Sequence, residues 1–261
     1  MQLNFRQYSE LGEPLIILHG LFGNLANWGT HSKFLAKHYS VFGIDLRNHG
    51  KSFHAPELNY PVMAEDVLVI MDRLNIASAN FIGHSMGGKV AMELALSRED
   101  KVDKLIVVDI APVTYAQSDE VHLRAIEGMQ SLDFDVIKTR KEAEKLLAEF
   151  VEEDVTREFL LTNLLRKESK KYKWRLNLQY IEQNYNRLRE RPSADIPFLK
   201  PCLFVKGEES NYIQEKNKQE ILKLFPNSQM KIIRRTGHWL HVDKPRVFQN
   251  HVLEFLQAEE K

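Results

Sequence analysis

Most of this 261-residue chain alternates between short apolar runs of strand length and longer stretches with helical periodicity. The runs predicted as strands are 14–19, 41–46, 81–82, 105–110, 203–206 and 230–233, and helices are predicted over 63–74, 90–96 and 247–256. In the helix 63–74, for example, apolar residues recur every three or four positions. Strands that alternate with helices of this length form a mostly parallel sheet with helices on both faces. The chain is therefore predicted to be an α/β protein.

The interval from residue 112 to residue 197 breaks this alternation, because it contains no run that predicts a strand. Apolar residues recur there at helical spacing, as in 143–150 and 178–188. Asp119, Asp133 and Asp154 are each expected to cap the start of a helix. We predict a helical cap over 112–197, inserted into a core formed by 1–111 and 198–261.

A G-x-S-x-G pattern, residues 83–87, lies between a predicted strand and a predicted helix. In such a sharp turn the glycines avoid collisions, and the strained backbone pushes the serine hydroxyl clear of the sheet edge. The pattern alone is equally typical of a plain glycine-rich turn, but the strand before it and the helix after it favour catalysis. Ser85 is the predicted nucleophile.

A serine needs a base within hydrogen-bond reach to become a nucleophile at neutral pH. His238 directly follows the last predicted strand, in a loop that would lie over the nucleophile turn, and it is the predicted base. His241 could form a metal pair with it, but no H-E-x-x-H pattern or carboxylate cluster supports one. His241 is therefore interpreted as structural, and no metal site is predicted.

Two positions compete for the acid that would orient His238. After the strand 203–206 stand Glu208 and Glu209, while Ser210 takes the place where an aspartate is common. Asp109 ends the strand next to the nucleophile strand, at the edge where sites gather in open α/β sheets. It could instead simply cap the following turn. Spacing favours Asp109.

The loop 19–23 follows an earlier predicted strand and contains Gly20 and Gly23. It can turn the N–H of Leu21 toward the nucleophile, where with the N–H of Met86 it would form an oxyanion hole. Aromatic residues near these loops could line an acyl pocket. Among the residues around the nucleophile, Phe22, His84 and Trp239 are expected to contact the substrate.

Composition excludes several other classes of protein. The 36 Lys and Arg balance the 36 Asp and Glu, which counts against nucleic-acid binding, although 166–175 is a dense basic segment. That segment is interpreted as a solvated surface, with attraction of an anionic substrate as the alternative. Cys202 is the only cysteine, which excludes an intramolecular disulfide and favours a reducing compartment. We expect no signal peptide, no membrane association and a cytoplasmic location.

The motifs together resemble those of the α/β-hydrolase superfamily, and within it the bacterial YbfF-type esterases. The matching stretches are 19–23, 45–50, 81–89, 109–113 and 237–239. This resemblance implies an α/β-hydrolase fold and hydrolysis of acyl esters and acyl-CoA thioesters without a cofactor. It also implies that Ser85, His238 and Asp109 form the catalytic triad, with Ser210 beside them. The substrate would be a small acyl ester or thioester, and the oligomeric state is not predicted.

Two alternatives use the same fold. A carbon–carbon hydrolase or lyase of the menaquinone-pathway type shares the triad but handles polar, carboxylated substrates. A ligand receptor with little turnover would carry a broken triad or oxyanion loop, and the sequence shows neither. Dehalogenase and epoxide-hydrolase chemistry is disfavoured because it needs an aspartate in place of Ser85.

Overall fold

A seven-stranded sheet forms the centre of the computed structural model, which describes residues 2–116, 120–169 and 171–258. The strands are β1 (Phe5–Gln7), β2 (Pro14–Leu18), β3 (Ser40–Ile44), β4 (Ala79–His84), β5 (Val102–Val108), β8 (Cys202–Gly207) and β9 (Ser228–Ile233). Their order is β1-β3-β2-β4-β5-β8-β9, and all pairs are parallel except β1 with β3. The predicted α/β class and its mostly parallel sheet are confirmed. Strand β1 was not predicted.

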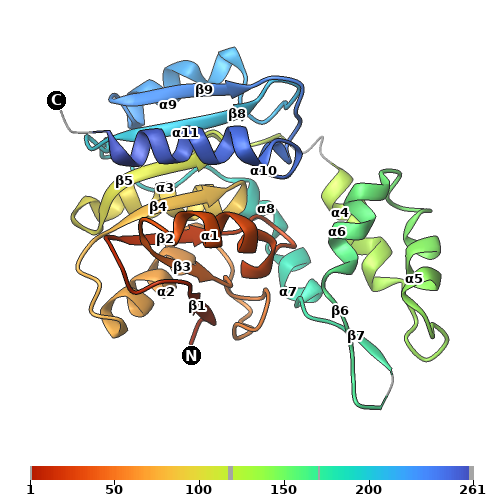
Figure 1. Cartoon of the computed structure of the whole chain (residues 1–261). Coiled ribbons are helices and arrows are strands. Elements are labelled where there is room, and N and C mark those ends of the chain that lie inside the picture. Colours follow the sequence, from red (N-terminus) through yellow and green to blue (C-terminus); the bar gives the residue numbers. More distant parts are fainter. Residues whose placement is uncertain (1, 117–119, 170, 259–261) are drawn as a thin grey trace.

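Helices cover both faces of this sheet (Figure 1). One face carries α1 (Gly29–Leu35) and α11 (Pro245–Gln257), and the other carries α2 (Tyr60–Arg73), α3 (Met86–Ser97) and α9 (Lys218–Leu224). The short α10 (Leu240–Asp243) precedes α11. Alternate strand residues serve the two cores: Ile16 and Leu18 pack with α2 and α3, whereas Leu15 and Ile17 pack with α1 and α11. Each such buried aliphatic side chain contributes about 1.5–3 kcal/mol.

The segment 112–197, called the insert below, lies between β5 and β8. It contains α4 (Glu120–Gln130), α5 (Arg140–Leu147), α6 (Asp154–Leu161), α7 (Leu178–Gln183) and α8 (Tyr185–Arg189). Figure 1 shows α4, α5 and α6 gathered beside one end of the sheet. The predicted helical character of this segment agrees with these elements.

The prediction that the insert has no strand is wrong. Strands β6 (Leu164–Arg166) and β7 (Tyr172–Trp174) form an antiparallel hairpin that contains part of the basic segment. Its stability comes from tertiary contacts that no local pattern reveals: the indole N–H of Trp174 donates to Met129 O at 2.7 Å, and Leu164 is buried.

The predicted helix caps of the insert also need correction. Asp133 caps a turn, where its Oδ1 accepts from Asp135 N at 2.8 Å, and no helix starts there. Asp154 is the first residue of α6, so Glu153 takes the cap position. Asp119 lies outside the described residues.

Across the described ranges, no helix is both long enough and apolar enough to cross a membrane.

Candidate active site

The turn between β4 and α3 holds Ser85 in a backbone conformation that side chains rarely adopt, with φ 52° and ψ −118°. The turn requires the neighbouring glycines. A Cβ at Gly83 would lie 2.3 Å from Gly87 O, and one at Gly87 would lie 2.5 Å from His19 O. Ser85 is 8% exposed and lines a cavity. This is the geometry that a nucleophile turn needs.

His238, in the loop between β9 and α10, reaches Asp109 at the end of β5. The distance between His238 Nδ1 and Asp109 Oδ2 is 2.7 Å. A carboxylate only accepts, so Nδ1 carries the proton and Nε2 is left to take one. Asp109 is fully buried, and its carboxylate also accepts from Gly207 N at 3.1 Å and from the hydroxyl of Ser210. The structure thus places Asp109, His238 and Ser210 in one hydrogen-bonded group.

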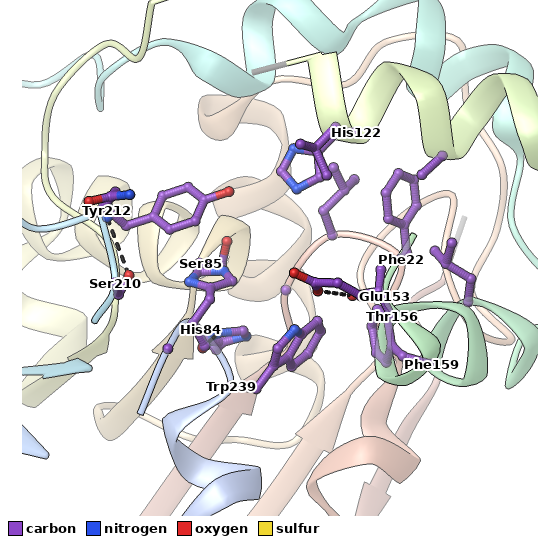
Figure 2. A pocket seen from close by; sticks show the side chains of 18 of the residues that line it. Phe22, His84, Ser85, His122, Glu153, Thr156, Phe159, Ser210, Tyr212 and Trp239 are labelled. Atoms are coloured by element: carbon purple, nitrogen blue, oxygen red, sulfur yellow. Dashed lines mark hydrogen bonds between the residues drawn. The ribbon is translucent and has the colours of Figure 1, made fainter. Parts of the chain in front are cut away.

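The two glutamates near Ser210 do not reach His238. Glu208 is exposed, and its Oε2 accepts from Arg235 N at 2.9 Å. Glu209 is also exposed and lines the cavity. Ser210 Oγ accepts from Tyr212 N at 3.3 Å (Figure 2). The Ser210 hydroxyl donates to Asp109. Of the three candidate acids, Asp109 has the hydrogen bond to the imidazole.

The loop 19–23, at the end of β2, is fixed by two buried histidines. His19 Nε2 accepts from Leu46 N at 3.0 Å, so its Nδ1 donates to Gly20 O at 2.8 Å. His49 Nε2 accepts from Phe22 N at 3.2 Å and supports the positive φ of 61° at Phe22. Leu21 lines the cavity beside Ser85. Met86 is the first residue of α3, where backbone N–H groups have no partner within the helix.

Sequence reasoning missed Asn163, a fully buried residue of the insert that reaches this loop. Its Nδ2 donates to Phe22 O at 2.7 Å, and its backbone O accepts from Arg175 N at 2.9 Å. The insert is thereby bonded directly to the loop that carries Leu21. A buried asparagine in a sequence gives no sign of so distant a partner.

The cavity has a volume of about 410 Å³ and lies between the sheet edge and the insert. All three residues predicted to contact substrate, Phe22, His84 and Trp239, line it. The insert contributes mainly apolar side chains: Tyr115, Val121, Ala125, Phe159 and Leu160. Figure 2 shows Trp239 between Ser85 and Phe159. The ring centroids of Trp239 and Phe159 are 4.4 Å apart.

His122, on α4, lines the cavity and was also not singled out by sequence reasoning. Its Nδ1 lies 2.9 Å from the hydroxyl of Tyr185, and Figure 2 shows its ring across the cavity from Ser85. Burial, and secondarily the charge of His238, lowers the pKa of His122 to about 4. It is therefore a neutral polar group in the cavity wall near pH 7.

His84 and His241 lie beneath His238. His84 Nε2 donates to His238 O at 3.1 Å and so helps to fix that loop. His241 is buried and stacks on Trp28 with 4.5 Å between ring centroids, which agrees with a structural residue. Burial lowers the pKa of both well below the ordinary value. In the part of the chain that the structure describes, no group of three or more His, Cys, Asp or Glu is placed to hold a metal ion.

These buried histidines make folding sensitive to acid. Burial lowers the pKa of His31 to about 4 and that of His49 to about 3. An unfolded histidine binds a proton near pH 6.5, whereas these resist protonation until pH 4 or below. The contribution of these neutral histidines to the free energy of unfolding is therefore fully present above pH 6.5. It is lost as the pH falls from 6.5 toward 4. We expect urea denaturation to show a loss of at least about 2 kcal/mol between pH 7 and pH 4.5.

The matched control for this acid effect is the exposed His38. Replacing His49 by glutamine is expected to remove the part of the pH dependence that His49 contributes, whereas His38→Gln leaves the pH dependence unchanged. An unfolding free energy that stays constant from pH 7 to pH 4.5 would contradict the assignment.

Comparison with known proteins gives relatives over nearly the whole chain. A solved structure described as a marine microorganism esterase is 43% identical, with a TM-score of 0.94 over 97% of this chain and 99% of that one. Esterase YbfF of Escherichia coli is 34% identical over 98% of this chain and 99% of its own. The mouse sn-1-specific diacylglycerol lipase ABHD11 is 36% identical over 93% of this chain and 80% of its own.

These matches confirm the resemblance that the motifs indicated. The sequence profile of the alpha/beta hydrolase fold matches residues 13–245, which include β2, the turn at Ser85 and the His238 loop. The chain belongs to the α/β-hydrolase fold family.

Proposed function

We propose that this protein is a serine hydrolase that cleaves carboxylic esters. The observation that carries the proposal is that Ser85, in its strained turn, shares a cavity with His238, whose imidazole is bonded to the buried Asp109. The printed names of the relatives, esterase YbfF and a diacylglycerol lipase, support ester hydrolysis as the reaction.

In this mechanism His238 Nε2 takes the hydroxyl proton of Ser85 as Oγ attacks the ester carbonyl. The N–H groups of Leu21 and Met86 stabilise the oxyanion of the tetrahedral intermediate. The imidazolium then gives its proton to the leaving alcohol, and water hydrolyses the acyl-enzyme with His238 as base. Asp109 keeps the imidazole in the required tautomer, and Ser210 and Gly207 N hold that carboxylate in place.

The insert, in this proposal, acts as a cap on the core 1–111 and 198–261 and forms the acyl side of the cavity. The apolar residues Val121, Ala125, Phe159 and Leu160 supply the surface that an acyl chain would bury. Among the described residues, the charged groups that line this cavity are the carboxylates Glu153 and Glu209. Arg189 lines a smaller pocket that adjoins the cavity at Ser85.

This charge distribution bears on the alternatives. A carbon–carbon hydrolase or lyase acting on carboxylated substrates needs a cationic partner for the carboxylate. Among the described residues of the cavity and its adjoining pocket, Arg189 is the one candidate, and its Nη2 already donates to Tyr115 O at 2.8 Å. We also propose acyl-CoA thioesters as substrates, since a thioester follows the same acyl-enzyme route. The coenzyme phosphates would then lie outside the cavity, and the basic segment 166–175, which contributes no described lining residue, does not contact the acyl site.

The test is hydrolysis of p-nitrophenyl acetate, butyrate and octanoate, together with the matched pair p-nitrophenyl pentanoate and p-nitrophenyl hydrogen glutarate. We expect turnover of the neutral esters. The glutarate half-ester is expected to react at least about 5-fold more slowly in kcat/KM than pentanoate, because its carboxylate would meet Glu153 and Glu209. The comparison is made at low salt, where charges at an exposed wall are screened least.

Two variants control for this charge effect. Glu153→Gln and Glu209→Gln together should narrow the difference between the two esters, whereas Glu208→Gln, on a residue that does not line the cavity, should leave it unchanged. A protein that is inactive on every neutral ester would contradict the esterase proposal and favour the lyase or receptor alternatives.

A further inference from the structure

Lys89 is a fully buried lysine that the reaction does not use. It lies on α3 one turn beyond the nucleophile, where its backbone N donates to Ser85 O at 3.0 Å, and it is 1% exposed. No ion pair of this ammonium is found among the described residues. Burying an amine without a paired charge costs free energy unless hydrogen-bond acceptors replace its hydration. The groups around Lys89 Nζ therefore show which parts of the chain this side chain joins.

The neighbours of Lys89 Nζ are the two chain segments that join the insert to the core. We call residues 111–116 the entry linker and residues 188–195 the exit linker. Nζ donates to Val113 O in the entry linker at 2.6 Å and to Glu190 O in the exit linker. It also lies 4.9 Å from the ring centroid of Tyr115 and 5.5 Å from that of Tyr60. One side chain therefore joins both linkers to the nucleophile helix.

The two linkers are also bonded to each other beside Lys89. Tyr115 N donates to Arg189 O at 2.9 Å, and Arg189 Nη2 donates to Tyr115 O at 2.8 Å. Arg191 N donates to Thr114 Oγ1 at 3.1 Å. The linkers thus form one joint. The core holds this joint from α3 and also through Tyr60, whose hydroxyl donates to Leu188 O, and through Tyr212, whose O accepts from the Tyr115 hydroxyl.

Glu93 adds a second attachment on the same face of α3, four residues after Lys89. Its Oε2 accepts from Ser193 N at 2.6 Å, and it is 3% exposed. Glu93 contacts only the exit linker, whereas Lys89 contacts both. Burial lowers the pKa of the Lys89 amine to about 7, and the nearby Glu190 raises it in part. The neutral amine has two N–H groups and the ammonium has three, so either protonation state can donate to both carbonyl oxygens.

We propose that Lys89 is a positioning residue: by holding both linkers against the nucleophile helix, it fixes the insert at its working distance from Ser85. The insert supplies Val121, Phe159 and Leu160 to the cavity wall, so a loosened joint would withdraw the surface on which a long acyl chain packs. Chemistry at Ser85 itself would change much less. The kinetic part of this inference rests on the proposed ester hydrolysis, whereas its structural part does not.

The test compares Lys89→Met with Lys200→Met. Lys200 is a matched control because its Nζ also donates to two backbone carbonyls, Glu99 O and Val102 O, each at 2.9 Å, at the opposite end of the sheet strands. Hydrogen exchange is followed in peptides covering the two linkers. We expect Lys89→Met to speed exchange at Tyr115, Arg191 and Ser193 by about 10-fold or more, and Lys200→Met to leave these amides unchanged.

Ester kinetics give the second readout. In Lys89→Met, KM for p-nitrophenyl octanoate should rise by about 10-fold while kcat/KM for the acetate changes less than about 3-fold. Equal losses on both esters would indicate general damage and overturn the proposal. Unchanged linker exchange in a folded Lys89→Met protein would also overturn it, whether or not the protein is an esterase.

The parent protein provides a measurement that needs no variant. The linker amides of Tyr115 and Arg191 are expected to exchange about as slowly as the hydrogen-bonded amides in the middle of α3. If these linker amides exchange as fast as those of an unstructured peptide, the two linkers do not form a joint. This result would hold even if Lys89→Met fails to fold.

Discussion

Replacing Ser85 by alanine is expected to lower kcat for p-nitrophenyl butyrate by about 10⁴–10⁶-fold. Without the hydroxyl no acyl-enzyme can form, and His238 and the oxyanion donors can only assist a direct attack by water. The residual rate should still exceed that of buffer, since oxyanion stabilisation and binding survive the substitution. The measurement is a steady-state assay of purified parent and variant at equal concentration.

Ser97→Ala is the matched control for this substitution. Ser97 lies at the last turn of the same helix, α3, and its hydroxyl donates to Glu93 O at 2.7 Å. It should keep parental turnover. A fluorophosphonate probe should add its mass to the peptide that contains Ser85 and should fail to label Ser85→Ala. Parental hydrolysis by Ser85→Ala would show that another group is the nucleophile.

Replacing Asp109 by asparagine is expected to lower kcat by about 10³–10⁴-fold. The amide presents an N–H to the ring, so the imidazole would carry its proton on Nε2 and could not accept one from Ser85. The backbone should tolerate the change, because asparagine readily adopts the positive φ of 52° found at this position. Circular dichroism and the thermal midpoint check that the fold is retained.

Glu208→Gln and Glu209→Gln test the competing acids at the end of the next strand. Both side chains are exposed, and the Glu208 carboxylate already accepts a hydrogen bond from the backbone N of Arg235. We expect each variant to retain kcat within about 3-fold of the parent, since neither carboxylate has a hydrogen bond to His238 in the structure. A larger loss in either of them than in Asp109→Asn would place the acid after β8 instead of after β5.

The central strands and the nucleophile turn could be predicted because local physics specifies them. A buried parallel strand must be apolar along its whole length, and the turn at Ser85 needs glycine on both sides. Asp109 could be ranked above the glutamates because the carboxyl ends of neighbouring parallel strands meet at one sheet edge. These arguments use only residues that are close together in sequence, or a rule about the sheet.

What could not be predicted depends on distant partners. Strand β1 has three residues, of which two are exposed, and it exists through its bonds to β3. The hairpin of β6 and β7 is equally short. Asn163 supports the loop 19–23 by donating to Phe22 O, and Phe22 lies 141 residues away in the sequence. His122 enters the cavity only because α4 packs over the sheet edge, and no periodicity encodes the direction of that packing.

The left-handed backbone of Phe22, Ser85 and Asp109 has a consequence for the evolution of this chain. Each of these residues would fold with less backbone strain as glycine, yet each carries a side chain at the site. Relief of backbone strain alone would favour glycine at these positions, but glycine would also remove the buried ring of Phe22 and the hydrogen bonds of the Asp109 carboxylate. In the proposed hydrolase, side chains that the reaction uses therefore lie on strained backbone, and packing in the two cores on either side of the sheet offsets the free-energy cost of that strain.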